Sequence, residues 1–432
     1  MEHSILVGWG QADITPKGGP ISLIGQWQER ISDIVRDPLQ ATAIVVESGD
    51  QRVIWVACDL LHITRPLTEA VRALLRDSVP SFHDEQLILS ATHIHTGPNT
   101  DEHPFTTLLE GRGDPPSALP TAECRRQIAL GIRTAVVHAM ESMQESTFGL
   151  ALSPAITGVN RRATYADGTA VMYGDIHRPD FRGMEGRDGG PIQILYVRNT
   201  GDNALTGIVA AVPCTAQCDE MGLYITADYW GAARGIIKAH FGEHVGILGL
   251  IRSSGDLSPH AMVDRTREAN RIYGADGAQL MGKRVDRAVI DAVADVAYTT
   301  GPCAAFAHLC SNEAYPIWTA TQEQYEWAKE YREAHDPALG KLEDMMAFSR
   351  AAASIKRHES PVKTYPCNLH VVRLGDIVLC TTPFELFIEY ADRIRAACPE
   401  ATVIDVQLAG DEALGYLATQ KAIDGGGYSA MI

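Results

Sequence analysis

The sequence lacks an excess of basic residues, and this absence narrows the range of partners. Its 37 lysines and arginines are outnumbered by 54 aspartates and glutamates, which gives a formal net charge of −17 at neutral pH. A net-acidic surface repels phosphate backbones and anionic membranes. The sequence also has no Lys/Arg cluster with interleaved aromatic residues, so we expect neither a nucleic acid nor a membrane as partner.

Paired cysteine motifs and long apolar runs are absent as well. The nine cysteines are odd in number and irregularly spaced, and none forms a Cys-x-x-Cys pair. This pattern favours reduced thiols in a cytosol over a disulfide framework. The N-terminus has no basic region or cleavage site of a signal peptide, and apolar runs such as Gly246 to Ile251 are too short to cross a bilayer. We therefore expect a cytoplasmic protein.

Strand-like and helix-like segments are mixed along the whole chain, which is 45% hydrophobic and 21% charged. This mixture predicts a mixed α/β (α/β or α+β) architecture of layered β-sheets flanked by helices. Strands are predicted at Ile5–Trp9, Ala41–Glu47, Val53–Cys58, Gln86–Ala91, Ile192–Val197, Thr206–Val212, Val245–Leu250, Leu369–Leu374 and Ile377–Thr381. Helices are predicted at Pro66–Leu75, Thr121–Met143, Tyr229–Phe241, Met262–Val296, Thr321–Glu333, Lys341–His358 and Phe384–Cys398.

The most informative stretch is the segment from Ser90 to Pro98, which contains two histidines two positions apart, His93 and His95. In an extended strand, side chains two apart point to the same face. The two imidazoles would then enter one pocket, where one can hold a metal while the other transfers protons. The alternative is a pair of strand histidines hydrogen-bonded to the backbone or to water.

Other candidate residues are less specific by pattern alone. Ser258, flanked by Asp256 and His260, follows an apolar strand, as a nucleophile can; the pattern by itself favours a helix N-cap with Pro259 at the first helical position.

Two further patterns also have plain structural interpretations. Arg161 and Arg162 beside a turn can grip a carboxylate or an oxyanion, although two surface cations are the simpler interpretation. Glu385 at a strand–helix junction can ligate a metal or merely offset the helix dipole. Tyr416 and Tyr428 lie in glycine-flanked loops, where a phenol can act as an acid, a donor or a metal ligand.

Together these pieces resemble the neutral ceramidase family, also called the neutral/alkaline non-lysosomal ceramidases. Six elements in the right order are specific for this superfamily, though not for ceramide as substrate. The matching elements are Val7–Pro16 with its Asp-Ile-Thr-Pro ending, Ser90–Pro98, Asn160-Arg161, Gly255–His260, Pro383-Phe-Glu385 and Gly415-Tyr416. The family's catalytic domain is a layered α/β fold that holds zinc and hydrolyses the amide bond of an N-acyl sphingoid base. The resemblance implies one such domain over residues 1–432, without the family's C-terminal immunoglobulin-like domain.

The resemblance also implies roles for individual residues. His93, Glu385 and Tyr416 would be zinc ligands, and His95 the general acid or base. Arg161 and Tyr428 would contact the oxyanion or substrate, and Ser258 would be a serine of the site. We place Arg162, Asp256 and His260 as substrate-binding residues.

One departure from the family concerns the metal. The family's second zinc histidine lies in a segment of the type Ala-Cys-His-Pro, but the corresponding stretch here, Val212 to Gln217, has no histidine. Thr215 stands where the ligand would be. Cys214, Gln217, Asp228 or His260 can substitute for it, or the site binds metal weakly, binds another divalent transition metal, or holds none.

Three functions follow from these patterns. The first is a zinc-dependent hydrolase of an amide or related acyl bond in a soluble, polar small molecule. The second is a carbohydrate- or cyclitol-processing hydrolase or lyase on the same fold, and the third is a non-catalytic protein that retains the ligand pocket. The oligomeric state stays open, with a homo-oligomer allowed.

Overall fold

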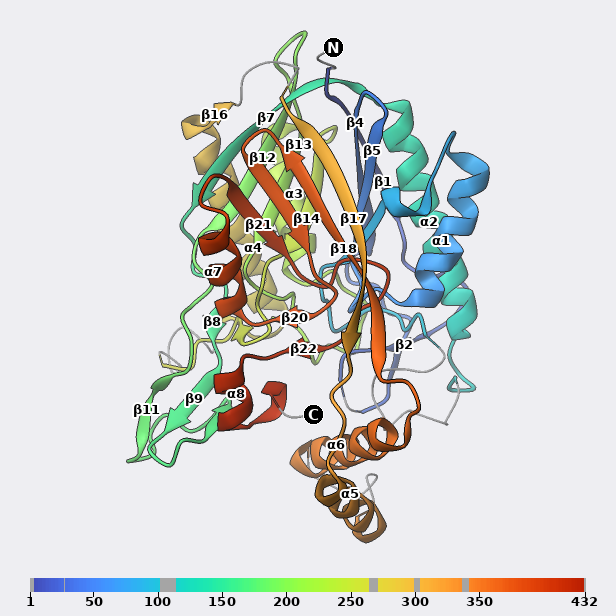
Figure 1. The fold of residues 1–432 in the computed structure, drawn as a ribbon. Helices are drawn as coiled ribbons and strands as arrows, with labels where there is room; N and C mark the ends of the chain where they lie inside the picture. The colour runs from blue at the N-terminus through green and yellow to red at the C-terminus, as the bar shows by residue number, and fades with distance from the viewer. Residues whose placement is uncertain are drawn as a thin grey trace.

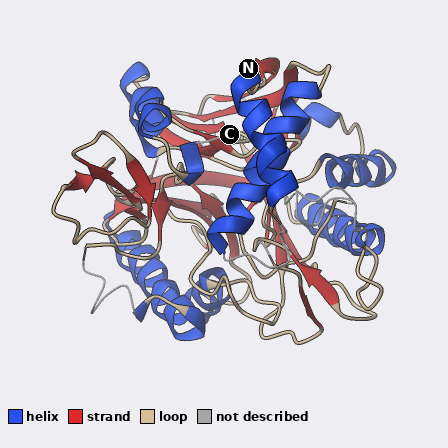
Figure 2. Ribbon diagram, turned by 90° about the horizontal axis from the view of Figure 1, so that it is seen from below, coloured by secondary structure: helices blue, strands red, loops and turns tan. Residues whose placement is uncertain are grey.

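Two β-sheets lie face to face in the middle of the molecule (Figure 1). The computed structural model describes residues 4–26, 28–101, 114–263, 271–298, 304–335 and 342–430. Seen from below, helices lie on either side of the strands and also in front of them (Figure 2). The layered, mixed α/β architecture predicted from the sequence is confirmed.

The larger sheet has nine strands, in the order β14-β13-β12-β7-β1-β4-β5-β6, with β16 paired to β7. Most neighbours are antiparallel, but β5/β6 and β13/β14 are parallel pairs. Parallel neighbours need a crossover connection, and helices α1 and α3 provide these two. The strands are β1 (Leu6–Asp13), β4 (Gln40–Ser48), β5 (Gln51–Cys58), β6 (Leu87–Ala91), β7 (Gln144–Ser153), β12 (Ile192–Asn199), β13 (Leu205–Val212), β14 (Gly246–Ile251) and β16 (Ala297–Tyr298).

The smaller sheet has the order β17-β18-β19-β21. Its strands are β17 (Phe306–Pro316), β18 (Thr364–Leu374), β19 (Ile377–Thr381) and β21 (Thr402–Val406). Helices α5 and α6 are inserted between β17 and β18 and lie below the sheets in Figure 1. The helices are α1 (Arg65–Ser78), α2 (Thr121–Glu141), α3 (Tyr229–Phe241), α4 (Gly274–Asp291), α5 (Gln322–Ala334), α6 (Leu342–Glu359), α7 (Ile388–Ala397) and α8 (Gln420–Gly425). Among the described residues, no helix combines the length and the apolar character that a bilayer crossing requires.

The larger sheet is buried on both faces. One face packs against helices α1 to α4 in a core that includes Ile54, Val71 and Ile132. The other face packs against the smaller sheet, where Trp55 and Leu248 join Ile404 in a second core. Burial on both faces explains why β13 reads as an almost continuous apolar run with every residue buried.

Strand ends from both sheets meet at one edge, and short strand pairs extend this edge. The Ala91 amide at the end of β6 donates to the Leu408 carbonyl, and Gln407 donates to Ile251 at the end of β14. The buried Gln407 side chain also accepts from the amides of Ser254 and Leu386. The short elements here are β2 (Ile21–Leu23), β3 (Arg30–Ser32), β8 (Val159–Asn160), β9 (Arg162–Tyr165), β10 (Ala170–Met172), β11 (Phe181–Met184), β15 (Leu257–Ser258), β20 (Glu385–Leu386), β22 (Tyr416–Leu417) and the 3-10 turn η4 (Tyr428–Ala430).

Two predicted helices begin later than expected. The helix predicted at Met262–Val296 is α4, which begins at Gly274, although residues 264–270 lie outside the described part. The helix predicted at Phe384–Cys398 begins at Ile388, because Glu385 and Leu386 pair with β22 instead. The Ile388 amide donates to the side chain of Asp256, so a residue distant in sequence caps α7.

Ser258 is not a helix N-cap, contrary to the simpler interpretation of its pattern. It lies in β15, where it pairs with Val159 of β8. Strands β7, β17 and β21 were missed from the sequence. In β17 most residues are exposed or half-buried, so the strand has too weak an apolar pattern to be recognised.

The packing predicts a large difference between two glycine substitutions. A Cβ on Gly207 of β13 would lie 2.1 Å from the Trp9 ring, whereas a Cβ on the exposed Gly235 of α3 would have nothing within 4 Å. We expect Gly207→Ala to lower the free energy of unfolding by about 1–3 kcal/mol through overpacking. Gly235→Ala should raise it by about 0.5–1 kcal/mol because alanine favours a helix interior. Urea denaturation of both variants tests this, and equal midpoints would contradict it.

Candidate functional site

A cavity of about 100 Å³ lies at the edge where the strand ends meet. Its polar lining comes from segments far apart in sequence: the loops after β5 and β6, the β20/β22 pair and the C-terminal turn η4. The polar side chains that line it include His62, His93, His95, Glu385, Tyr416 and Tyr428.

His93 and His95 both line this cavity, but not for the predicted reason. Strand β6 ends at Ala91, and His93 has a positive φ of 62°, so the two residues are not part of an extended strand. The rings meet edge to face with centroids 4.9 Å apart. Nδ1 of His93 is hydrogen-bonded to the Leu61 carbonyl at 2.8 Å, which leaves Nε2 3.6 Å from Oε2 of Glu385.

Arg161 links strand β22 to the loop that precedes β15. Glu385 and Tyr416 are direct neighbours in the parallel β20/β22 pair. Nη2 of Arg161 donates to the Tyr416 hydroxyl at 3.1 Å and to the Gly255 carbonyl at 2.9 Å. The ring of Tyr428 meets that of Tyr416 at a centroid distance of 5.6 Å. The structure therefore brings His93, His95, Arg161, Glu385, Tyr416 and Tyr428 together.

Burial dominates the electrostatics of this group. It raises the pKa of Glu385 to about 7, although Arg161 and a hydrogen bond from Tyr416 oppose the shift. It lowers the pKa of His93 to about 4 and that of His95 well below its usual value. For His95, the charges of His93 and Arg30 act in the same direction, and a backbone contact with Gly25 opposes them. Both imidazoles are therefore neutral at neutral pH, the form that can bind a metal or accept a proton.

The residues present fit a metal only in part. The carbonyl bond on Nδ1 of His93 is the support that metal-bound imidazoles usually have, and it directs Nε2 toward Glu385. Across the described segments, however, no group of three or more His, Cys, Asp and Glu side chains is placed to hold an ion. Tyr416, the phenol beside Glu385, would be the third protein ligand that the sequence resemblance implies.

The residues considered as replacements for the family's second zinc histidine make other contacts in this structure. Thr215 donates to the Gln217 side chain at 2.6 Å, and the thiol of Cys214 points to the Thr215 carbonyl. Asp228 accepts from the amides of Asp219 and Tyr229, as the cap of α3. His260 stacks on Tyr273 at 3.7 Å between centroids.

Five predicted site residues are not among those that line the cavity: Arg161, which contacts the lining residue Tyr416, and four others. Ser258 accepts from the Tyr173 hydroxyl at 2.9 Å and from the His260 amide at 3.1 Å. Asp256 accepts from Asn160 at 2.9 Å in addition to capping α7. The fully buried Arg162 pairs with Glu185 at 2.7 Å and donates to the Gly426 carbonyl. These contacts make Arg162, Asp256, Ser258 and His260 supports of the site in this structure.

Three residues near the cavity were missed by the sequence analysis. His62 lines it, Glu220 lies beside His95, and the buried Arg30 contacts the backbone of both neighbours. None belongs to a recognisable motif. Only the position of Glu220, shortly after the segment that lacks the expected histidine, was a signal in the sequence.

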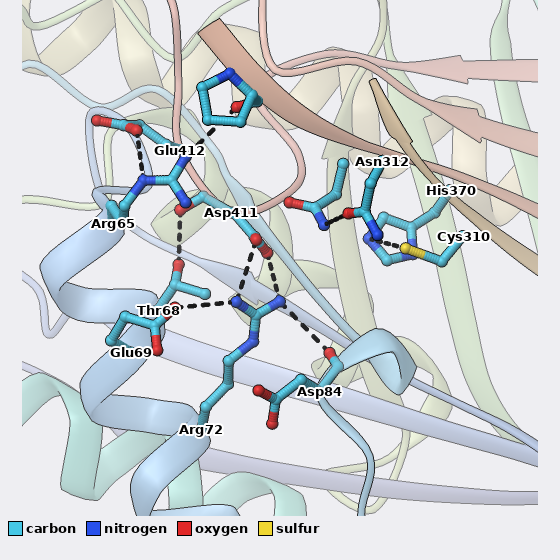
Figure 3. A network of polar contacts seen from close by, with 12 residues as sticks. Arg65, Thr68, Glu69, Arg72, Asp84, Cys310, Asn312, His370, Asp411 and Glu412 are labelled. Carbon is cyan, nitrogen blue, oxygen red and sulfur yellow. Dashed lines mark hydrogen bonds and ion pairs between the residues drawn. The ribbon is translucent and has the colours of Figure 1, made fainter. Parts of the chain in front are cut away.

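A network of ion pairs attaches the cavity wall to helix α1 (Figure 3). Asp411, in the loop that leads to Tyr416, accepts from Nη2 and Nη1 of Arg72 at 2.6 and 3.0 Å. The Asp411 carbonyl accepts from Thr68 at 2.8 Å, and the next residue, Glu412, accepts from Arg65 at 2.9 Å. Both members of the Arg72–Asp411 pair are almost fully buried.

This arrangement of sheets and strand ends is a neutral ceramidase-like fold, as the sequence resemblance predicted. The structure of neutral ceramidase from Pseudomonas aeruginosa matches 100% of this chain and 71% of its own, with a TM-score of 0.71 and 17% sequence identity. A ceramidase complexed with C2 matches 99% of this chain and 72% of its own, with the same TM-score and identity. No protein-family model and no curated protein sequence matches the chain.

The buried pair in this network predicts a stability difference between two neighbouring arginines of α1. Arg72→Met would leave the buried carboxylate of Asp411 without its main partner, so we expect a loss of about 3–5 kcal/mol in unfolding free energy. Arg76→Met removes only the partly exposed pair with Asp84, which should cost less than about 1 kcal/mol. Thermal and urea unfolding measure both, and similar losses would refute a special role for Arg72.

Proposed function

We propose that this chain is a metal-dependent hydrolase of an amide or related acyl bond in a small polar molecule. The observation that carries the proposal is the convergence of His93, Glu385 and Tyr416 at one buried cavity, with the Arg161 cation hydrogen-bonded to Tyr416. The motifs that supply these residues resemble those of the neutral ceramidases, which hydrolyse an amide bond. The neutral ceramidase-like fold supports the same class of reaction.

His93, Glu385 and Tyr416 would hold the metal, for which zinc is our expectation. Zinc would act as a Lewis acid and lower the pKa of a bound water to about 7. A metal cation would stabilise the anionic forms of Glu385 and Tyr416, which burial disfavours and which only Arg161 stabilises as a neighbouring positive charge.

The remaining groups suit proton transfer and charge stabilisation. His95 is buried and neutral, so it can accept a proton at the cavity and return it to the leaving group. Arg161 keeps its positive charge beside Tyr416, where it would stabilise an oxyanion. Burial raises the pKa of Tyr428 to about 12, so its phenol stays protonated and can donate a hydrogen bond.

The size of the cavity favours a small substrate. Its volume of about 100 Å³ lies below the range of roughly 300–1,000 Å³ that is typical of drug-sized ligands. Histidine, glutamate and tyrosine side chains dominate the polar part of the wall. A short acyl group fits this space better than a lipid chain.

One observation favours a second candidate, a protein that binds a small molecule without converting it. The described residues offer no group of three His, Cys, Asp or Glu ligands, and the site then depends on a phenol to complete the metal sphere. The third function considered from the sequence therefore stays the alternative, and metal content separates the two.

Metal content is the first prediction of this function. Protein purified without added metal or a histidine tag should contain close to one zinc ion, or another transition metal, per chain. His93→Ala should lose it, because two donors remain, whereas His138→Ala on the exposed face of α2 should keep it. Elemental mass spectrometry measures all three, and wild-type protein that neither contains nor takes up metal would favour the binding protein.

Turnover should depend on the guanidinium of Arg161. Arg161→Lys keeps the charge but loses the forked geometry, so we expect kcat on a short N-acyl amine or ester to fall by about 10²–10³-fold. Arg182→Lys, an exposed arginine on the neighbouring β11, is the matched control and should leave kcat unchanged. Steady-state kinetics on the substrate found by screening gives the answer; equal kcat values would remove Arg161 from the reaction.

A further inference from the structure

Tyr173 contacts the Arg161 guanidinium from the turn that follows β10. Its ring centroid lies 5.9 Å from Cζ of Arg161, and its hydroxyl donates to Oγ of Ser258 at 2.9 Å. A guanidinium over the face of a phenol ring is stabilised by a cation–π interaction. Tyr173 thus connects Ser258 of β15 with Arg161, which donates a hydrogen bond to Tyr416.

The backbone also holds Tyr173 beside Arg161. Met172, the last residue of β10, pairs with Arg162 of β9, and the amide of the next residue, Tyr173, donates to the Arg161 carbonyl at 2.8 Å. The Arg161 amide in turn donates to the Asp256 carbonyl at 3.0 Å. The backbone of the arginine is therefore fixed between β10 and the loop before β15, and side-chain contacts direct its guanidinium.

Tyr173 has a backbone conformation that a tyrosine does not favour. It is the third residue of a tight turn in which the Gly174 amide donates to the Val171 carbonyl at 3.2 Å, and its φ is 54°. A positive φ at this position of a turn favours glycine or asparagine, and for a bulky residue it is an outlier. Such strain concentrates at functional sites, where the surrounding contacts maintain it. Here the contacts with Arg161 and Ser258 offset the strain.

Ser258 is placed to hold Tyr173 rather than to attack a substrate. It is fully buried and is not among the residues that line the cavity. Its Oγ accepts from the Tyr173 hydroxyl at 2.9 Å and from the His260 amide at 3.1 Å. Both bonds direct the lone pairs of this oxygen at protein donors, whereas a nucleophile would present them to the substrate.

We propose that Tyr173 is a positioning residue that holds the Arg161 guanidinium against Tyr416 at the cavity wall, with Ser258 as the acceptor that fixes the Tyr173 hydroxyl. The assignment rests on the hydrolase function proposed above, in which Arg161 stabilises an oxyanion. Such stabilisation is effective when the donor is already in place before charge develops. Ser258 then supports the site through Tyr173, and the reaction needs no acyl-serine intermediate.

NMR of arginine side chains tests the assignment without any substrate. The full chain would be labelled with ¹⁵N-arginine, and the guanidinium signals of Arg161 identified by their loss in Arg161→Lys. A guanidinium held by fixed partners rotates slowly about its Cζ–N bonds and gives separate Nη signals. We expect separate signals in wild type and averaged signals in Tyr173→Ala. Tyr173→Asn should give the same result, and it guards against a folding failure because asparagine tolerates the positive φ.

The role of Ser258 is tested by combining variants. Tyr173→Phe keeps the ring and Ser258→Ala keeps the backbone pairing, but each removes the hydrogen bond between the two side chains. We expect the same shift of the Arg161 signals in either variant and no further shift in the double variant, because both act through one contact. Tyr165→Phe is the matched control. It removes a tyrosine hydroxyl bond in the same three-stranded sheet, to the Asp175 carbonyl, and should leave the Arg161 signals unchanged.

Each outcome decides the proposal. Wild-type Arg161 signals in both Tyr173→Ala and Tyr173→Asn would overturn it, because the other partners of the guanidinium would then suffice to hold it. An equal change in Tyr165→Phe would overturn it too, as a general disturbance of the sheet. Additive shifts in the double variant would overturn the role given to Ser258.

Kinetics separate the proposal from the function on which it rests. With a substrate in hand, Tyr173→Ala should lower kcat about 10²-fold with little change in KM, since a displaced Arg161 weakens transition-state contacts. Tyr173→Phe, which keeps the ring, should lose less. Absence of hydrolysis in wild type would count against the proposed function alone, because the NMR comparison does not depend on turnover.

Discussion

The site depends on the need of buried guanidinium groups for hydrogen-bond acceptors. A guanidinium has several donors, no acceptor and a permanent charge, so burying it is tolerated only where enough oxygen atoms converge. Arg30 donates hydrogen bonds to the carbonyls of Ile24, His95 and Glu220, which lie in three different segments. Arg162 donates to the carboxylate of Glu185 and to the carbonyls of Ala422 in α8 and of Gly426 just after it. Since most of these oxygens belong to loop backbones, the arginines determine how the loops lie.

The two-sheet architecture explains why these loops meet at all. The larger sheet is covered by helices on one face and by the smaller sheet on the other, so ends of strands from both sheets are adjacent. Backbone bonds such as Ala91 to Leu408 and Gln407 to Ile251 connect these ends directly. Residues separated by hundreds of positions, such as His93 and Glu385, thereby come within 3.6 Å of each other.

Local signals in the sequence predicted the elements whose ends are set by neighbouring residues. Helix α3 was predicted with its observed bounds, because Asp228 caps its start and Gly242, with φ 110°, ends it. Strand β19 was also predicted as observed, between a turn and Pro383. Prediction failed where distant partners satisfy the backbone: the Glu385 amide donates to Gly415 rather than starting a helix. No local pattern contains that information.

The sequence by itself determined the fold class, the resemblance to the neutral ceramidases and the set of candidate site residues, because motifs keep their order along the chain. Only the tertiary structure decided which of these residues reach the cavity. It moved Arg162 and Ser258 into supporting contacts and brought Glu220 beside His95. The physical reason is that a side chain's direction is set by long-range hydrogen bonds and packing, which a linear pattern does not encode.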